Sequence, residues 1–598
     1  ELEVFQDLLA GRVGPRTNAY GQRFSATLSM GWVDRPWLNW VDVQDVSYQS
    51  RFDWSNGSKG SLQGAGVRNS LTLRTGVRLR PNKVWERFGF FERLKAAQRE
   101  EETRGRRTRN GGEDKAGEDG DTDDEDEGLG WEDVPLPDLR GVLRGAALMV
   151  LDINDFSVNY NGDWSAQSSN VGSSLTVEAG DTTGVNTSYR LLDALRGEGP
   201  SLGYRLGLAR SIDPSNRILS DELGFQVTDA LSNRHRLEGR TSLSPSASVQ
   251  VDLGWNLEWQ TQTNTTLQPG EGEAVGRFST QSGENAASVW GFGSVVSLVQ
   301  AQVDRLEQGA GQEEALTAEA APLTNASVSA DFKSAFLAGG GSLGAEGFAP
   351  FPLPNWSIRY SGLSDWPLIG SIVKNASLRH GYNAEYQSSY ASVTGQNEPE
   401  PVPLLEGVRF RAADFKVGAA RVSERFQPLL GLSITWPGNL ETSVKWNTQT
   451  ETYLRTANLK VEEVETTELS GSVSYRKRGL RIPVLGLGRL ENQIQFSLTL
   501  SRSVNDERSY NLQGALAAAR ASDFSLGAGA ITDPTNDFVE VRKQTTRVQI
   551  TPELTYRLSD RVTGDLLVEY ERFNGDNRQP SYTRINGGFN IRVSITQN

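Results

Sequence analysis

The chain has 598 residues, no cysteine and two histidines, and its 61 basic and 75 acidic residues give a net charge of −14. This composition excludes disulfides, cysteine nucleophiles and clusters of several histidine ligands. The acidic balance argues against non-specific nucleic-acid binding. No run approaches the roughly 18 consecutive apolar residues of a membrane-spanning helix. The chain opens at Glu1 without a basic-then-apolar leader, which predicts a processed chain or a fragment.

Alternation of apolar and polar residues dominates the chain and predicts strands with one apolar and one polar face. In the first 210 residues the alternating segments are 24–32, 46–54, 71–79, 156–164 and 202–208. Segment 249–259 is the most regular. Its apolar positions are Val249, Val251, Leu253, Trp255, Leu257 and Trp259, and its polar positions include Gln250, Asp252, Asn256, Glu258 and Gln260.

Two segments interrupt the strand pattern. Residues 99–133 combine an arginine cluster with an acidic run at 113–127, and we expect a solvated, disordered loop there. The acidic run departs from a calcium-binding loop, because Asp124 stands where that loop requires glycine. Residues 288–306 carry apolar side chains at helical spacing and predict one short amphipathic helix within a loop, which either plugs a lumen, docks on a neighbour or fills a loop.

The C-terminal third shows the most regular alternation. Segments 430–436 and 440–446 flank the turn Pro437-Gly438-Asn439 and predict a hairpin. Further strands follow, and we expect about 20 in all. Long polar loops are expected around 389–405, 502–546 and 574–583. The last predicted strand carries Ile585, Phe589, Ile591, Val593 and Ile595 on one face.

Strand length favours a membrane barrel over a soluble β-sandwich. Segment 249–259 has ten rises of ~3.3 Å, which at a tilt of ~45° project to roughly 23 Å, close to the ~25 Å apolar band of outer-membrane barrels. We therefore predict an all-β fold, a transmembrane antiparallel β-barrel. Its lumen-facing residues would be Gln250, Asp252, Asn256, Glu258 and Gln260, and its membrane-face or interface aromatics Trp255, Trp259, Trp436 and Trp446.

The sequence offers no catalytic motif. Neither G-x-S-x-G nor H-E-x-x-H occurs, and His380 lies in an alternating segment while His235 is expected in a turn. We therefore predict neither an enzyme nor a cofactor or metal site.

Four strings resemble the SprA (Sov) family. They are LNW at 38–40, PLPNWSIRYSGL at 352–363 with LRHGY at 378–382, ERFQPLLG at 424–431 and ELSGSVSYR at 468–476. The resemblance runs in family order from about Trp37 to Asn598, and family members are several times longer. It implies that residues 1–598 are the C-terminal portion of a very large single-chain barrel, either a fragment or one piece of a split barrel.

The resemblance implies the protein-conducting translocon of the type IX secretion system, in the outer membrane of a Bacteroidetes-like Gram-negative bacterium and linked to gliding motility. The implied partners are outer-membrane lipids, a PorV-like barrel subunit, a periplasmic plug protein, folded cargo with C-terminal sorting domains and the N-terminal remainder of the barrel. The residues alone leave two alternatives: a self-contained porin or receptor barrel for small solutes, and a soluble or surface-displayed adhesive β-protein.

Overall fold

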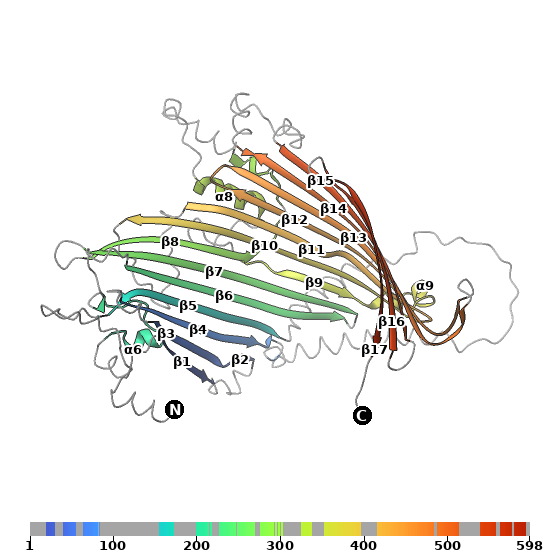
Figure 1. Ribbon diagram of the computed structural model, residues 1–598, viewed down its shortest axis with the longest axis horizontal. Coiled ribbons are helices and arrows are strands. Elements are labelled where there is room, and N and C mark those ends of the chain that lie inside the picture. The colour runs from blue at the N-terminus through green and yellow to red at the C-terminus, as the bar shows by residue number, and fades with distance from the viewer. Residues whose placement is uncertain are drawn as a thin grey trace.

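The alternating segments form one antiparallel sheet of 17 strands (Figure 1). The computed structural model describes residues 19–29, 40–55, 64–81, 83, 155–172, 199–213, 216–217, 227–246, 248–269, 275–291, 293–295, 297–299, 301–302, 325–337, 352–395, 416–482, 487–512, 539–557, 562–576 and 579–593. Within these residues the predicted all-β antiparallel fold is confirmed. The charged segment 99–133 and Ile595 lie outside the described residues.

The strands lengthen toward the C-terminal half, where the alternation is most regular. They are β1 (Ala19–Leu28), β2 (Val41–Val43), β3 (Val46–Ser55), β4 (Ala65–Leu79), β5 (Phe156–Val171), β6 (Val227–Ser246), β7 (Val249–Pro269), β8 (Val275–Ser288), β9 (Asn355–Tyr360), β10 (Asn375–Gly395), β11 (Lys416–Trp436), β12 (Leu440–Arg455), β13 (Lys460–Ile482), β14 (Leu487–Asn511), β15 (Val539–Arg557), β16 (Val562–Asn574) and β17 (Tyr582–Val593). The helices are α6 (Leu202–Arg205), α8 (Asn325–Phe336), α9 (Pro367–Gly370) and the 3₁₀ turn η5 (Gly362–Asp365).

Strands that follow one another along the chain mostly pair with each other. There are two exceptions. β1 pairs with β3, and β2 and β3 pair with different parts of β4. The second exception is the position between β7 and β10, which two short strands share. In this position β8 pairs with both β7 and β10 over one part of their length, and β9 pairs with both of them over the other part. Among the described residues, β1 pairs with β3 alone and β17 with β16 alone, so these two strands are the edges of the sheet.

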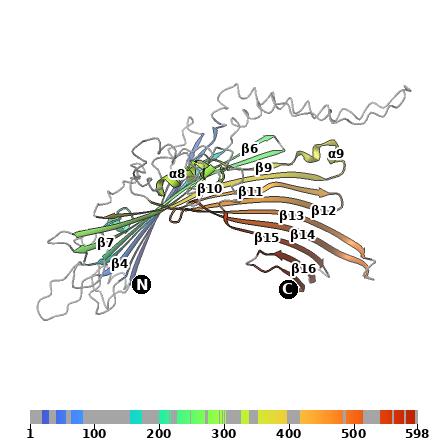
Figure 2. The same ribbon diagram turned by 90° about the horizontal axis from the view of Figure 1, so that it is seen from above.

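The sheet is strongly twisted, and its strands are long for a membrane wall (Figure 2). β14 has 25 residues, which at a rise of ~3.3 Å per residue extend about 80 Å. A strand tilted by ~45° needs only about 35 Å to cross a ~25 Å apolar band. A sheet of this kind therefore projects well beyond any bilayer that it crosses.

The two ends of the strands differ in how the chain connects them. At one end, called here the short-turn end, two to four residues separate β6 from β7, β11 from β12, β13 from β14 and β15 from β16, although 76 residues separate β4 from β5 there. At the other end, the long-connection end, 55 residues separate β5 from β6, 20 separate β10 from β11 and 27 separate β14 from β15, whereas only four separate β12 from β13. Outer-membrane barrels have short periplasmic turns and long outer loops, and on this ground the orientation proposed below takes the short-turn end as periplasmic.

The segment 202–208 is helical where alternation predicted a strand. The Ser201 hydroxyl accepts a hydrogen bond from the Tyr204 amide at 3.1 Å and caps α6, and Gly207 takes a φ of +78° just beyond it. Tyr204 is fully buried and packs edge-on against Phe52 on β3, with ring centroids 6.3 Å apart. A tertiary contact and a cap therefore override a short alternating pattern.

The predicted helix at 288–306 begins later than expected. Ser288 is the last residue of β8, paired with Glu385, and Gly291 forms a bridge with Leu337, so backbone pairing holds this stretch extended. Helical conformation occurs at 295, 297–299 and 301–302, where Val295, Leu298 and Val299 are buried. Residues 303–306 lie outside the described residues. The sequence interpretation missed α8, which packs against β11 beside this helical stretch.

Two further expectations are corrected. His235 lies in the middle of β6 rather than in a turn, because its ring stacks on Trp259 of β7 at 4.9 Å. The loop expected at 502–546 is shorter: β14 continues to Asn511 and β15 starts at Val539, since paired charged residues extend both strands. Similarly, β10 continues to Gly395. Among the described residues the sheet has 17 strands, and the roughly 20 expected referred to the whole chain.

Candidate functional site

The sheet has two chemically different faces, defined here on β7. The polar face carries Gln250, Asp252, Asn256, Glu258 and Gln260, and the apolar face carries Val249, Val251, Leu253, Trp255, Leu257 and Trp259. Directly paired residues of neighbouring strands lie on the same face, so the strand registers extend both faces across the sheet. The structure thus groups the five predicted lumen residues on one face. Whether that face lines a lumen remains a prediction.

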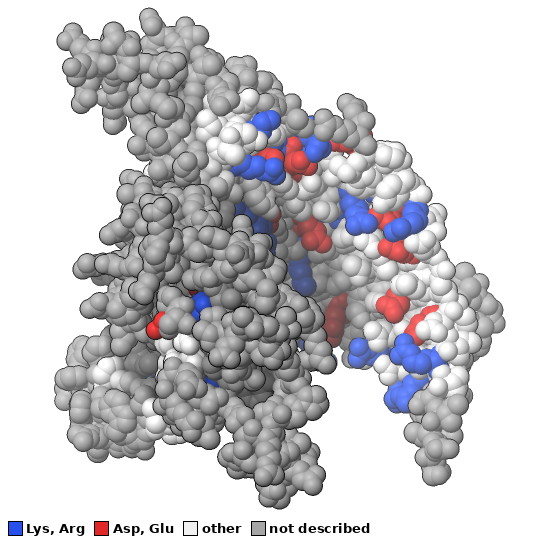
Figure 3. All heavy atoms as spheres, turned by 60° about the vertical axis from the view of Figure 1, so that its left-hand side comes forward, with Lys and Arg blue, Asp and Glu red and all other residues white. Residues whose placement is uncertain are grey.

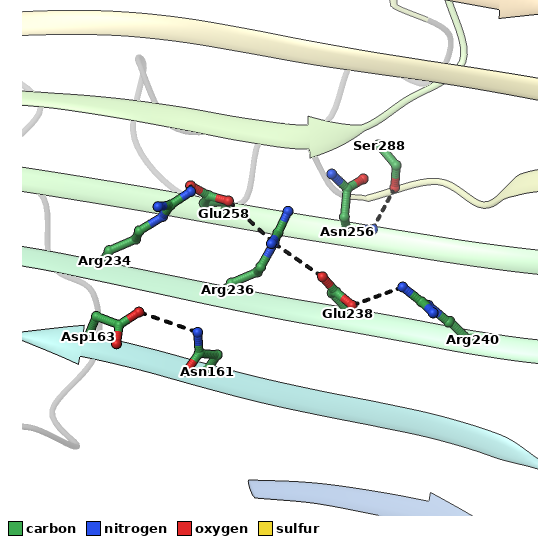
Figure 4. Close-up of polar contacts among 9 residues, drawn as sticks. All are labelled: Asn161, Asp163, Arg234, Arg236, Glu238, Arg240, Asn256, Glu258 and Ser288. Carbon is green, nitrogen blue, oxygen red and sulfur yellow. Dashed lines mark hydrogen bonds and ion pairs between the residues drawn. The ribbon is translucent and has the colours of Figure 1, made fainter. Parts of the chain in front are cut away.

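Ion pairs link neighbouring strands on the polar face of β6 and β7 (Figure 4). Glu258 on β7 pairs with Arg234 at 2.7 Å and with Arg236 at 3.4 Å, and Arg236 also contacts Glu238 at 3.2 Å. Glu238 in turn pairs with Arg240 at 3.2 Å. The charges therefore alternate in sign along this face and compensate one another.

The same pattern continues on the C-terminal strands, where charged side chains of both signs line a hollowed face of the molecule (Figure 3). On β12, Glu451 accepts hydrogen bonds from Arg421 at 2.5 Å and Arg425 at 3.1 Å. On β16, Glu571 is almost fully buried between Arg547 and Arg584, with which it forms ion pairs. Exposed pairs of this kind are individually weak, so their main effect here is charge compensation.

The apolar face of β11–β17 carries a continuous exposed stripe, called here the apolar band. Several of its side chains are more than half exposed, including Leu469 at 52%, Ile585 at 70% and Phe589 at 66%. The band consists of Leu430, Leu432, Ile434, Trp436, Leu440, Val444, Trp446, Leu469, Val473, Tyr475, Phe496, Leu498, Leu500, Ile550, Leu554, Tyr556, Leu566, Val568, Tyr570, Ile585, Phe589, Ile591 and Val593. Such a large exposed apolar surface is typical of an interaction with a membrane or another protein.

The band lies near the short-turn end of the strands. On β14 it ends at Leu500, and the same face continues with Arg502, Asp506 and Arg508 toward the long-connection end. Trp436 and Trp446 belong to the band, and Trp436 donates a hydrogen bond to the Thr442 hydroxyl at 2.9 Å. Trp446 is 44% exposed, whereas Trp436 is partly buried against Leu363, Val373 and Ala376. All described members of the predicted last-strand set lie in the band too.

The other two predicted interface aromatics have packed surroundings. Trp255 contacts Phe156 edge-on at 5.5 Å, and Trp259 stacks on His235. On the neighbouring β3–β5, the apolar face is covered by the segment that contains α6, and Phe52, Leu71 and Trp164 are buried. The apolar face is thus largely covered at β3–β5, and α8 with Val295, Leu298 and Val299 covers it on β10–β11 toward the long-connection end, whereas the apolar band itself is largely open.

An aromatic junction forms where β9 lies between β7 and β10. Trp356 of β9 stacks on Tyr382 of β10 at 4.3 Å, and Tyr382 contacts Phe426 of β11 at 4.9 Å. The Gly291 amide donates a hydrogen bond to the Tyr382 hydroxyl at 2.9 Å, and His380 contacts the Leu429 carbonyl oxygen at 2.7 Å through Nδ1. Residues of segments that are far apart in the sequence thus meet at one place.

Gly381 permits the close approach of β10 and β11 in this junction. A Cβ atom at this position would lie 2.8 Å from the carbonyl oxygen of Gln427. We predict that Gly381→Ala destabilises the protein by roughly 1–3 kcal/mol, because β10 and β11 must separate. Urea unfolding followed by tryptophan fluorescence measures this effect. Gly471→Ala is the matched control, since its nearest neighbour, the Ser443 carbonyl oxygen, would be 3.8 Å away. An equal change in both variants would contradict the prediction.

The described residues do not suggest a catalytic or metal site. Within them, no group of three or more His, Asp or Glu side chains is placed to hold a metal ion. No helix among the described residues is both long and apolar enough to span a membrane.

Comparisons with known proteins give no family assignment. No protein-family model and no curated protein sequence matches the chain. Solved structures with a remote likeness include the ferripyoverdine receptor of the outer membrane of Pseudomonas aeruginosa (TM-score 0.24, 6% identity, 97% of this chain and 58% of that chain) and the RagAB peptide transporter (0.25, 7%, 91% and 49%). A third is BauA, the ferric preacinetobactin receptor of Acinetobacter baumannii (0.24, 7%, 96% and 72%).

These values are too low to support an argument about function. The chain spans 58% and 49% of the length of the first two of these proteins. The functional argument therefore depends on the two faces of the sheet and on the aromatic junction.

Proposed function

We propose that the chain forms part of the wall of an outer-membrane barrel that conducts folded proteins, the translocon of the type IX secretion system. In this proposal the apolar band contacts lipid and the polar face lines the passage. The conduit acts by gated passage and performs no catalysis. We also propose that it belongs to the SprA (Sov) family of a Bacteroidetes-like bacterium, in which it serves gliding motility.

The width of the sheet is the observation that supports a passage large enough for a folded protein. Among the described residues the 17 strands form a sheet with two separate edges, β1 and β17, which do not pair with each other. Because β8 and β9 share one position of the sheet and β2 and β3 share another, the sheet is 15 positions wide. A barrel that contains it as one part of its wall is wider than this. Barrels of 16–18 strands already enclose an aqueous channel, so a barrel of which this sheet is only a part would enclose a passage for more than small solutes.

The aromatic junction supports the family assignment. Trp356 and Tyr382 come from the two halves of one string that resembles the family and Phe426 from another, and Tyr382 contacts both other rings across β9, β10 and β11. Sequence strings whose side chains pack in one cluster have a shared structural reason to occur together in the same chain. On this proposal the partners are the N-terminal remainder of the barrel, a PorV-like subunit, a periplasmic plug protein and cargo with C-terminal sorting domains.

Site-specific blocking tests the conduit. The chain contains no cysteine, so a single Gln250→Cys variant offers one thiol on the polar face. We expect that a bulky, membrane-impermeant maleimide stops the release of a cargo with a C-terminal sorting domain, which then accumulates in the periplasm. The assay is performed in cells of the source bacterium and follows the cargo in medium and periplasm.

Leu500→Cys, in the apolar band, is the matched control. Lipid should protect this thiol from the reagent, and secretion should continue. Continued secretion from cells in which Gln250→Cys is fully labelled would contradict the proposed passage. If secretion is normal in cells without the protein while uptake of a small solute is lost, the chain belongs to a solute barrel instead.

A further inference from the structure

A row of arginines follows the apolar band on the apolar face of β14–β16. Arg502 on β14 pairs directly with Val548 on β15, and Val548 pairs with Arg572 on β16. The last row of the band, Leu500, Ile550 and Tyr570, lies immediately below them toward the short-turn end. Both arginines are exposed. They therefore mark the point at which the face changes from apolar to cationic.

The acidic groups of this region are already engaged by other residues. Asp506 is 8% exposed and bonds Arg508 at 2.7 Å and Arg542 at 3.2 Å. Glu465 lies 3.9 Å from Arg508, and Glu463 accepts a hydrogen bond from the Tyr510 hydroxyl at 3.0 Å. Among the described residues, neither Arg502 nor Arg572 forms an ion pair with a carboxylate.

The geometry of the row suits an anion with two or more acceptor oxygens. Arg502 and Arg572 are two strands apart, which is roughly 10 Å between their backbones. Guanidinium groups bind phosphate in a bidentate manner, and long arginine side chains reach across apolar neighbours such as Val548 to place their charge at a polar boundary. Two arginines on either side of one valine can therefore converge on one phosphate.

We propose that this row, Arg502 and Arg572, binds the phosphate of a lipid A-type glycolipid whose acyl chains lie on the apolar band. The row faces away from the short-turn end, which is the outer side of the membrane in the proposed orientation. A phosphorylated glycolipid of the outer leaflet would present its phosphates at that level. The proposal rests on the membrane-wall part of the proposed function.

Lipid binding to the purified full chain tests the site. The protein is inserted into phosphatidylcholine nanodiscs, and the probes are lipid A with both phosphates, lipid A without phosphate, phosphatidylglycerol and inorganic phosphate. Native mass spectrometry counts the lipids retained. We expect bisphosphorylated lipid A to bind and Arg502→Gln/Arg572→Gln to weaken its binding at least tenfold.

The control variant removes two cations from the polar face, Lys445→Gln/Arg476→Gln, and it should bind lipid A as the parent does. Equal binding of lipid A without phosphate, or equal loss in the control variant, would overturn the site. Equal competition by inorganic phosphate or phosphatidylglycerol would overturn the assignment to lipid A. A chain that fails to insert into nanodiscs contradicts the membrane wall itself, so the two failures are distinguishable.

Discussion

Replacing Phe496 by arginine is expected to destabilise the protein in a bilayer by about 2–4 kcal/mol, whereas the same replacement of the adjacent Ser497 should have little effect. Phe496 is 37% exposed in the apolar band, two rows deeper than Leu500, while Ser497 lies on the polar face. A charged side chain near the middle of a bilayer loses its hydration, and a charged side chain on an aqueous face does not. Urea titration of the folded, lipid-embedded protein measures both free energies of unfolding.

The paired design separates the membrane wall from a soluble sheet. Exposed positions of a water-soluble protein tolerate such a change within about 0.5 kcal/mol. If Phe496→Arg and Ser497→Arg behave alike, the apolar band does not contact lipid. The parent protein in the same bilayers provides the reference for both variants.

The second large effect is expected at the aromatic junction. Tyr382 is 2% exposed and contacts Trp356 and Phe426, so Tyr382→Ala should cost roughly 3–5 kcal/mol of stability through the cavity that it leaves. Hydrogen exchange should show β9 losing protection first, because β9 has only six residues in the sheet. The measurement combines urea unfolding with exchange followed by mass spectrometry.

Two control variants test the cause of this effect. Tyr382→Phe keeps the ring and removes the hydroxyl, which accepts a hydrogen bond from the Gly291 amide and donates one to Glu424, so we expect a loss of about 1–3 kcal/mol. Trp446→Ala removes an aromatic ring that is 44% exposed, and in detergent it should cost less than Tyr382→Ala. A larger loss for Trp446→Ala would show that the junction is not a centre of stability.

Alternation was sufficient to predict the strands and their faces. The pattern at 249–259 repeats with the same period of two as the backbone of a strand, so the sequence separates Gln250 from Val251 without any tertiary information. The hairpin at 430–446 was equally accessible, because the Pro437-Gly438-Asn439 turn gives Gly438 and Asn439 the positive φ that they tolerate. These predictions depended only on local properties of the chain.

Features that depend on the pairing register of the strands could not be predicted from the sequence. Arg234 and Glu258 form an ion pair across 24 positions, and nothing in either segment specifies that they lie at diagonal positions of paired strands. β8 and β9 likewise share one position of the sheet because each pairs with only a part of β7 and β10. The row of Arg502 and Arg572 was missed for the same reason. The helix α6 was missed because the burial of Tyr204 against Phe52 outweighs a four-residue pattern.

The compensated charges of the polar face determine how strongly this face attracts a charged protein that moves along it. Glu258, Glu451 and Glu571 each contact two arginines, so each of these carboxylates is fully matched by positive charge within the wall. In the proposed conduit, a strongly basic protein would find these carboxylates already engaged. The surface would then be hydrated and would impose little friction on basic cargoes.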